Sequence, residues 1–342
     1  MGKGVARLPW RRCNTIALLA AAFGWIAWLG CGDDDALIDP VTARPEVVSS
    51  SLAANPNNAI SAIVTTSTIS AARVRVVIEA DGAQVDQTPN FAVTSKTTQV
   101  PVLGLQPETD YTLWVAAFSV SGRIAAGDRM PFRTGALPTS ITSFEVVTSG
   151  GSEPGFTLLA PIFDIGHPAV IVDSKGRVVW YRETPTGVVD FQLQPNGHYT
   201  GAVPVPASEP FFPAVYEEWD ELGNLIRTWT TPGFELTDSH DIRLTADGTE
   251  ALLLAYEART SDLTSVGGPS SATVIGNVLQ RVTTGGGVSF EWDAFDHYEL
   301  EDADDFVWTS PAAGGFDFTH ANAIEVEADG DYLLSTRHLS EI

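Results

Sequence analysis

The chain has 342 residues, 44% of them hydrophobic, and 19 Lys and Arg against 43 Asp and Glu give it a formal net charge of −24. This length allows two domains with sizeable cores. A surface this acidic repels nucleic acid and anionic lipid headgroups, so we expect no nucleic-acid partner, and an anionic substrate would need a local positive pocket. Short alternating runs rich in Val, Thr, Ile, Gly and Pro predict an all-β chain after residue 40.

Residues 1–30 are organised like a signal peptide, with a basic start and then the apolar run TIALLAAAFGWIAWLG. The following WLGCGDDD resembles a bacterial lipobox with Cys31 as the lipidated residue, although Trp28 stands where Leu is usual. We therefore expect a lipoprotein of the bacterial cell envelope, attached to the membrane through Cys31, with residues 31–45 as an acidic tether. Ordinary signal-peptide cleavage and an uncleaved anchor remain alternatives. The only other cysteine, Cys13, also lies in the signal region, so the mature domains have no disulfide.

Residues 46–135 show alternating strands separated by turns, which predicts a β-sandwich. The segment LQPETDYTLWVAAFS, which begins at Leu105, has the Leu, Pro, Thr and Tyr spacing of the fibronectin type III signature. The span resembles such a domain, which implies that the Tyr111 hydroxyl bonds to nearby backbone at a corner between two strands. No cluster of ionisable groups appears here, so we expect a spacer or docking role. Residues 134–143 are the predicted linker.

Residues 144–342 contain two kinds of hairpin in alternation. One has an Asp and Gly turn followed by Trp, and the other has a polar start and an apolar exit. Two hairpins make a unit of four strands with a spacing of about fifty residues, which is typical of a β-propeller blade. Residues 257–276 are interpreted as a loop insertion. About three and a half units fit, whereas a propeller closes with four or more blades, so we expect an incomplete propeller.

Four polar residues of this domain form the candidate site. His240 and His320 each precede an Ala-Asp-Gly turn by a similar interval and are predicted to hold equivalent positions, Asn322 follows His320, and Arg337 ends the last strand. Repeats would bring these residues together around one axis. Two imidazoles, an amide and a guanidinium, without cysteine or a dense carboxylate cluster, favour a site for sulfate, phosphate or carboxylate.

Other interpretations of the polar residues stay open. Arg337 and His338 could simply cap an edge strand. His240, His320 and Asp241 could bind a metal, but no HxH or HExxH spacing is present, so the anion site is preferred and no metal or cofactor is expected. The remaining histidines of this domain are interpreted as surface or satisfied residues: His167, His198 and His297.

The segments SHDIRLTADGTEALLL and DFTHANAIEVEADGDYLLSTRHLSEI resemble the arylsulfotransferase family, PAPS-independent bacterial enzymes built on a six-bladed propeller. In that family a phenolic sulfate ester gives its sulfuryl group to a histidine, and a phenol then accepts it. The resemblance implies an aryl sulfate donor, a phenolic acceptor and a ping-pong mechanism. It also implies that His240, His320, Asn322 and Arg337 bind and stabilise the transferred group, and that His338 belongs to the substrate-binding set.

One departure concerns the nucleophile. In the family it is a histidine of a later blade, and no histidine of this chain maps onto it. We therefore interpret the chain as a fragment that carries the binding half of the site. The alternatives are a non-catalytic propeller lipoprotein that binds a ligand or a protein partner, and a propeller metalloenzyme.

Overall fold

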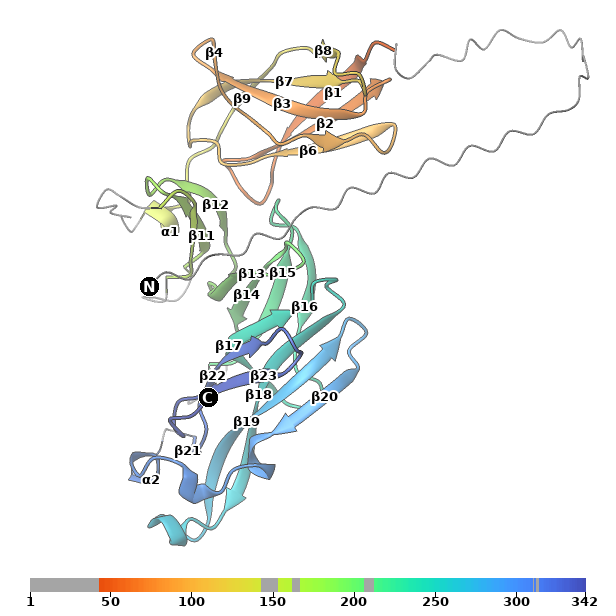
Figure 1. Cartoon of the computed structure of the whole chain (residues 1–342). Coiled ribbons are helices and arrows are strands. Elements are labelled where there is room, and N and C mark those ends of the chain that lie inside the picture. Colours follow the sequence, from red (N-terminus) through yellow and green to blue (C-terminus); the bar gives the residue numbers. More distant parts are fainter. Residues whose placement is uncertain (1–42, 143–152, 162–166, 206–211, 310, 312–313) are drawn as a thin grey trace, which may run out of the picture. The chain divides into compact units, whose positions relative to one another are not determined.

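The computed structural model describes residues 43–142, 153–161, 167–205, 212–309, 311 and 314–342 (Figure 1). These residues form several antiparallel sheets with few helices, which confirms the all-β prediction. The predicted signal peptide, Cys31 and most of the predicted tether lie outside the described residues. Over the ranges that are described, no helix has both the length and the apolar character needed to cross a membrane.

Two sheets enclose the core of the first half of the chain. One sheet contains β1 (Glu46–Ala54), β2 (Ala62–Ile69) and β6 (Thr97–Val102). The other has the strand order β4 (Ala83–Gln87), β3 (Arg73–Ala80), β7 (Asp110–Phe118) and β8 (Ile124–Ala126). In this second sheet β5 (Phe91–Ala92) also pairs with β3, and β9 (Met130–Arg133) pairs with β7. Alternate residues point inward because side chains change face at every step along a strand. Val64 of β2 and Val76 of β3 are fully buried in this shared core.

The predicted tyrosine contact is present between the two sheets. Tyr111 is buried, and its hydroxyl accepts a hydrogen bond of 2.9 Å from the backbone N–H of Gln106. The Thr134 hydroxyl adds a bond of 2.6 Å to the Gln106 carbonyl and accepts one of 2.9 Å from the Thr109 N–H. These bonds fix the segment that crosses from β6 to β7.

The second half of the chain forms four successive sheets in which neighbouring strands follow one another along the chain. Their strands are β10 (Phe156–Leu159), β11 (Ala169–Asp173) and β12 (Val178–Arg182); β13 (Val189–Leu193), β14 (Tyr199–Pro204), β15 (Ala214–Trp219) and β16 (Leu225–Trp229); β17 (Leu236–Leu244), β18 (Glu250–Ser261), β19 (Ala272–Thr283) and β20 (Val288–Asp293); and β22 (Ala321–Val326) with β23 (Tyr332–Thr336). The short β21 (Phe316–Asp317) pairs in parallel with β19. The helices are α1 (Thr139–Thr142) and α2 (Phe306–Thr309), with 3-10 turns at Thr264–Val266, Ala294–Asp296 and Leu300–Asp302.

The loop insertion predicted for residues 257–276 is wrong in its extent. Strands β18 and β19 pair as far as Ser261 and Ala272, so half of this segment belongs to a long ladder and only residues 262–271 connect the strands. Runs of Thr, Ser and Gly hid its strand character, because the pairing of two long strands supplies the backbone hydrogen bonds that local propensity does not favour.

Successive sheets pack face to face and repeat one pattern of core. Tyr216 and Trp229 of the second sheet pack against Ile242, Leu253 and Val282 of the third. The third sheet in turn packs against the β22–β23 hairpin, around a cluster of buried aliphatic residues that includes Leu254 and Ile324. As a result β17 contacts β13 and β22, so the first strands of three sheets lie close together (Figure 1).

Candidate functional site

The first strands of three sheets each contain a bulge. The register shifts lie between Val189 and Gln192, between Thr237 and Ile242, and between Ala321 and Ala323. A bulge turns side chains away from the regular alternation and is frequent beside active sites. Two non-glycine residues here have left-handed backbone: Asp190, inside the first bulge, with φ 46°, and His320, directly before the third, with φ 47°. Such conformations cost free energy and persist where the surrounding structure enforces them.

Two carboxylate and histidine pairs lie at these bulges. Nδ1 of His240 is 2.5 Å from Oδ1 of Asp238, and Nδ1 of His320 is 2.5 Å from Oδ2 of Asp317. The two imidazole rings approach to 5.2 Å between centroids. A carboxylate at Nδ1 fixes the orientation of the ring and favours a proton there, so Nε2 is the nitrogen available to an anionic ligand.

His338 extends the row of rings. Its Nδ1 is 2.6 Å from the backbone carbonyl of Asp317, and its ring centroid lies 4.8 Å from that of His320. The ring of Phe306 stands perpendicular to it at 5.0 Å. His240, His320 and His338 therefore share one pattern, in which Nδ1 is bonded to an oxygen acceptor.

A buried amide joins the two pairs. Nδ2 of Asn277 donates to Oδ2 of Asp238 at 2.9 Å, while its Oδ1 accepts from the Thr319 hydroxyl and from the Ala321 N–H, each at 2.8 Å. Asp238, Asn277 and Thr319 are all buried. A fully bonded network in a low-dielectric interior is rigid, so a displacement of one pair would disturb the other.

A second acidic network lies on β13 and β17. Nε2 of Gln192 donates to Oδ1 of Asp190 at 2.6 Å and to Oδ1 of Asp241 at 2.8 Å. Oδ2 of Asp241 accepts from the Ile324 N–H at 2.7 Å, and Arg243 lies 3.0 Å from its Oδ1. Burial raises the pKa of Asp190 to about 7 and also raises the pKa of Asp241. The sequence grouped Asp241 with His240 and His320 as possible metal ligands. In the structure its carboxylate is bonded to Gln192, Ile324 and Arg243 instead.

The electrostatics favour a charged imidazole at His240. The hydrogen bond to Asp238 raises the pKa of His240, burial opposes this, and the charges of Asp317 and Asp190 raise it further. Each carboxylate stabilises the imidazolium form, because an opposite charge at short range favours the charged state. A cationic donor beside His320 is the local positive group that an anionic substrate would need in so acidic a protein.

The predicted equivalence of His240 and His320 is wrong. Ile242 and Ile324 each lie four residues before the Ala of their Ala-Asp-Gly turn and hold the same place in their hairpins, so His240 corresponds to Asn322. The two rings still meet, because β17 has the longer bulge.

The two other residues predicted for the site, Asn322 and Arg337, differ in how much they are exposed to solvent. Asn322 is half-buried beside the β22 bulge. Arg337 is exposed, and its backbone N–H donates to the His320 carbonyl at 3.2 Å. Asp238, Asn277 and Asp317 were not among the predicted site residues, although an Asp two or three residues before each histidine was a readable signal for two of them.

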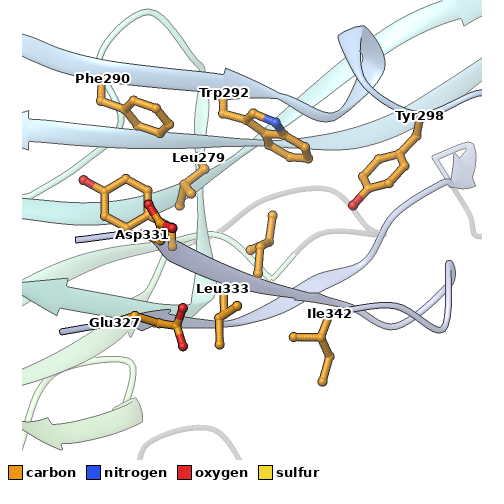
Figure 2. Close-up of a pocket in the computed structure, with 10 residues that line it drawn as sticks. Leu279, Phe290, Trp292, Tyr298, Glu327, Asp331, Leu333 and Ile342 are labelled. Atoms are coloured by element: carbon orange, nitrogen blue, oxygen red, sulfur yellow. The ribbon is translucent and has the colours of Figure 1, made fainter. Parts of the chain in front are cut away.

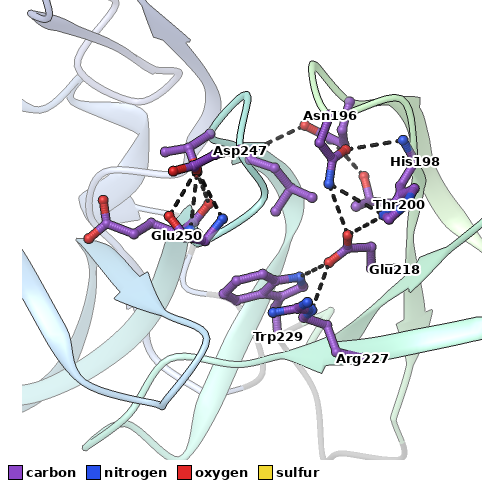
Figure 3. A network of polar contacts seen from close by, with 12 residues as sticks. Asn196, His198, Thr200, Glu218, Arg227, Trp229, Asp247 and Glu250 are labelled. Carbon is purple, nitrogen blue, oxygen red and sulfur yellow. Dashed lines mark hydrogen bonds and ion pairs between the residues drawn. The ribbon is translucent and has the colours of Figure 1, made fainter. Parts of the chain in front are cut away.

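His198 is satisfied in a separate network (Figure 3). Glu218 is buried and accepts from His198 Nδ1 at 2.6 Å, from Asn196 Nδ2 at 3.0 Å and from Trp229 Nε1 at 3.0 Å. Arg227 lies 3.3 Å from the same carboxylate. This arrangement agrees with the prediction that His198 is a satisfied structural residue.

One group of residues in the described ranges has the composition of a metal site. Asp317, His320 and His338 each offer one ligand atom, and the three atoms lie within 4.8 Å of one another. The same imidazoles can donate to an oxyanion from Nε2, so the arrangement allows anion binding by the imidazoles and metal binding by the Asp317 group.

The comparisons with known proteins identify the family. The sequence model described as Arylsulfotransferase (ASST) matches residues 147–342, more than half of the chain. No match is found among curated proteins. Among solved structures, a protein of unknown function from Bacteroides caccae aligns with 74% of this chain and 84% of its own, at 10% identity and a TM-score of 0.28, a likeness too weak to guide interpretation. The three histidines lie within the matched segment, and the chain belongs to the arylsulfotransferase (ASST) family.

Proposed function

We propose that the chain is the binding part of an arylsulfotransferase, which moves a sulfuryl group from a phenolic sulfate ester to a phenol. The observation that supports this most directly is the presence of two carboxylate and histidine pairs whose rings are 5.2 Å apart. Family membership implies aryl sulfate substrates. The geometry supplies a reason for binding them, because two oriented imidazoles can donate from Nε2 to different oxygens of one sulfate ester.

Charge stabilisation is the proposed role of these pairs. Sulfuryl transfer resembles phosphoryl transfer, in which negative charge spreads over the equatorial oxygens and the protein mainly positions and stabilises the group. The sulfur–oxygen bond to the aryl group breaks while sulfur bonds to a histidine nucleophile. The departing phenolate takes a proton from an imidazolium of the site. In the second half-reaction the acceptor phenol oxygen bonds to sulfur while the sulfur–nitrogen bond of the sulfohistidine breaks, and the phenol proton goes to the imidazole that protonated the first phenolate.

We also propose that the four sheets of the second half are propeller blades and that the nucleophile belongs to a further blade. Two features of the last sheet support additional strands. Thr336 and Glu341 form an antiparallel bridge, which starts a strand along the free edge of β23. Trp292 is half-buried at a position where the preceding sheet buries Trp229. A third strand on β23 would cover it.

For the rest of the chain we propose an exported lipoprotein with a fibronectin-III-like domain over residues 46–135 as a spacer. The Tyr111 contact supports the domain assignment. Lipidation is tested by radiolabelled palmitate and membrane fractionation. Cys31→Ser is expected to lose the label and move the protein to the soluble fraction. Equal membrane association of both forms would indicate an uncleaved anchor instead.

The test of the enzyme proposal uses protein made from the complete reading frame. Transfer from 4-nitrophenyl sulfate to phenol is followed by release of nitrophenolate and by formation of phenyl sulfate. Asp238→Asn and Asp317→Asn are expected to lower kcat/KM by roughly 10²-fold or more, because each removes the carboxylate that is bonded to Nδ1 and orients the imidazole ring. Asp329→Asn, in an exposed turn, is the matched control and should retain activity.

A folded, complete protein without transfer would contradict the proposal. If that protein still bound the aryl sulfate without turnover, the alternative of a non-catalytic ligand-binding lipoprotein would replace it. The absence of a histidine in this chain that maps onto the family nucleophile is what favours this alternative.

A further inference from the structure

We propose that Asp317, His320 and His338 form a binding site for a divalent transition-metal ion such as Zn²⁺. One ligand atom from each residue lies within 4.8 Å of the others. Two imidazoles and one carboxylate are a donor set that such ions accept, and three protein ligands leave room for a water or a substrate oxygen. This site differs from the set His240, His320 and Asp241 that the sequence had indicated.

The distances are close to those that a metal ion needs. Oδ2 of Asp317 is 2.5 Å from Nδ1 of His320 and 4.0 Å from Nδ1 of His338. Ligand atoms about 2.1 Å from a tetrahedral ion are about 3.4 Å apart. The observed values lie on either side of that separation, so side-chain shifts of roughly 1–1.5 Å would complete the site, and Nδ1 of His338 would give up its bond to the Asp317 carbonyl. The ion would replace the hydrogen bond between His320 and Asp317.

The backbone around the three ligands is held by contacts between separate segments. Asp317 is in β21, which pairs in parallel with β19 through Ile275. The backbone N–H of His338 donates to the Thr319 carbonyl at 3.1 Å. His320 has left-handed backbone at φ 47°, which turns its ring toward Asp317. Ligands that are already ordered lose little conformational entropy when a metal binds.

The ion pairs of Asp317 distinguish this carboxylate from Glu218 and Asp241, whereas Asp238 likewise pairs with one histidine. Among the buried or half-buried acids of the second half, Glu218 already has Arg227 and Asp241 already has Arg243. In the described part of the chain the ion pairs of Asp317 are with His320 and His338 alone. A carboxylate with two imidazoles and no Lys or Arg can accept a cation without displacing one.

Solvent can reach the three ligands. The exposed fractions of the side chains are 27% for Asp317, 23% for His320 and 11% for His338. The formal net charge of −24 attracts cations to the protein as a whole. An ion could therefore enter without local unfolding.

A regulatory consequence rests on the proposed function. Metal binding would take His320 and Asp317 out of the anion site, so Zn²⁺ is expected to inhibit sulfuryl transfer and a chelator to restore it. The binding itself does not depend on catalysis, so the two proposals can fail separately.

Isothermal titration of the chelator-treated full chain with Zn²⁺ tests the site. One ion per chain is expected, and Asp317→Asn and His338→Ala should each weaken the affinity at least about tenfold. Co²⁺ offers a second readout, since its visible absorption bands report on imidazole and carboxylate coordination. His297→Ala is the matched control, because this ring stacks on Trp292 outside the cluster.

Three results would overturn the inference or part of it. Absence of stoichiometric binding to the folded wild type would overturn it, and so would unchanged affinity in both variants after thermal unfolding has verified their fold. Zn²⁺ binding with no effect on transfer would overturn the regulatory consequence alone. A protein that binds Zn²⁺ but never transfers a sulfuryl group would contradict the proposed function and leave the metal site standing.

Discussion

Trp229 and Trp292 hold the same register position on the last strands of two successive sheets, but only Trp229 is buried. Each is the fifth residue of its strand. Trp229 lies opposite Tyr216, and Trp292 lies opposite Leu279. Trp229 is 2% exposed and packs in a cluster that includes Val282 of β19. Trp292 faces a pocket of about 450 Å³ between β20 and the β22–β23 hairpin (Figure 2). In the preceding sheet β19 is the third strand, next to β18. Within the described residues, the β22–β23 sheet has no corresponding third strand next to β23.

This difference predicts unequal costs of truncation. Trp229→Ala should lower the free energy of unfolding by about 3–5 kcal/mol, because a buried indole leaves a cavity. Trp292→Ala should cost roughly 1–2 kcal/mol, because half-buried apolar surface contributes in proportion to its area. Denaturant unfolding followed by circular dichroism measures both. Equal losses would mean that Trp292 is covered in solution.

Asp190 predicts a pH dependence of stability. Its pKa in the folded protein is raised from 3.8 to about 7 by burial, with the neighbouring Asp241 charge as a further cause. The folded state therefore binds this proton more tightly than the unfolded state, so stability falls as pH rises from about 4 to 7. Asp190→Asn should remove that fall and stabilise the protein at pH 8 by up to about 4 kcal/mol. Asn also tolerates left-handed backbone, which the φ of 46° requires.

Urea unfolding of wild type and Asp190→Asn at several pH values tests this expectation. Asp247→Asn is a useful contrast because turn hydrogen bonds lower the pKa of Asp247 to about 2. The contribution of Asp247 to folding stability is present above the pKa that this group has in the unfolded chain, and it is lost as pH falls through about 2. A constant difference in stability between Asp190→Asn and wild type across pH 4–8 would contradict the assignment.

Asp238 predicts the titration of His240. Its hydrogen bond is the largest cause that raises the pKa of His240 above the usual 6.5. The stabilisation that this pair provides is therefore present below the unfolded pKa and is lost as pH rises through the folded value. Asp238→Asn should lower the pKa of His240, as followed by NMR of isotope-labelled imidazoles. An unchanged titration would show that Asp238 does not hold the imidazolium.

Gly201 predicts a steric limit in the core of the second sheet. A Cβ at this position would lie 2.5 Å from Trp219 and 2.6 Å from Val188, both of which are buried. Gly201→Ala should therefore destabilise the protein by about 1–3 kcal/mol. Gly285→Ala is the control, since its Cβ would come no closer than 3.8 Å to Thr283. Similar thermal unfolding of the two variants would argue against tight packing at Gly201.

The sequence by itself determined most of the strands, the turns and the family, because these depend on local patterns. Alternation places Val76 inside, and the glycine of an Ala-Asp-Gly turn marks where a hairpin reverses. It also selected His240 and His320, which the structure brings to 5.2 Å.

Only the tertiary structure decided how those histidines are supported. The bulge of β17 changes the register between Thr237 and Ile242, which no alternation pattern reveals, and it brings Asp238 to His240. Asn277 of β19 contacts both Asp238 of β17 and Ala321 of β22, and such contacts over long sequence separation leave no local signal. The charge, orientation and metal-binding capacity of the site arise from these contacts, because hydrogen bonds and pKa values depend on neighbours in space.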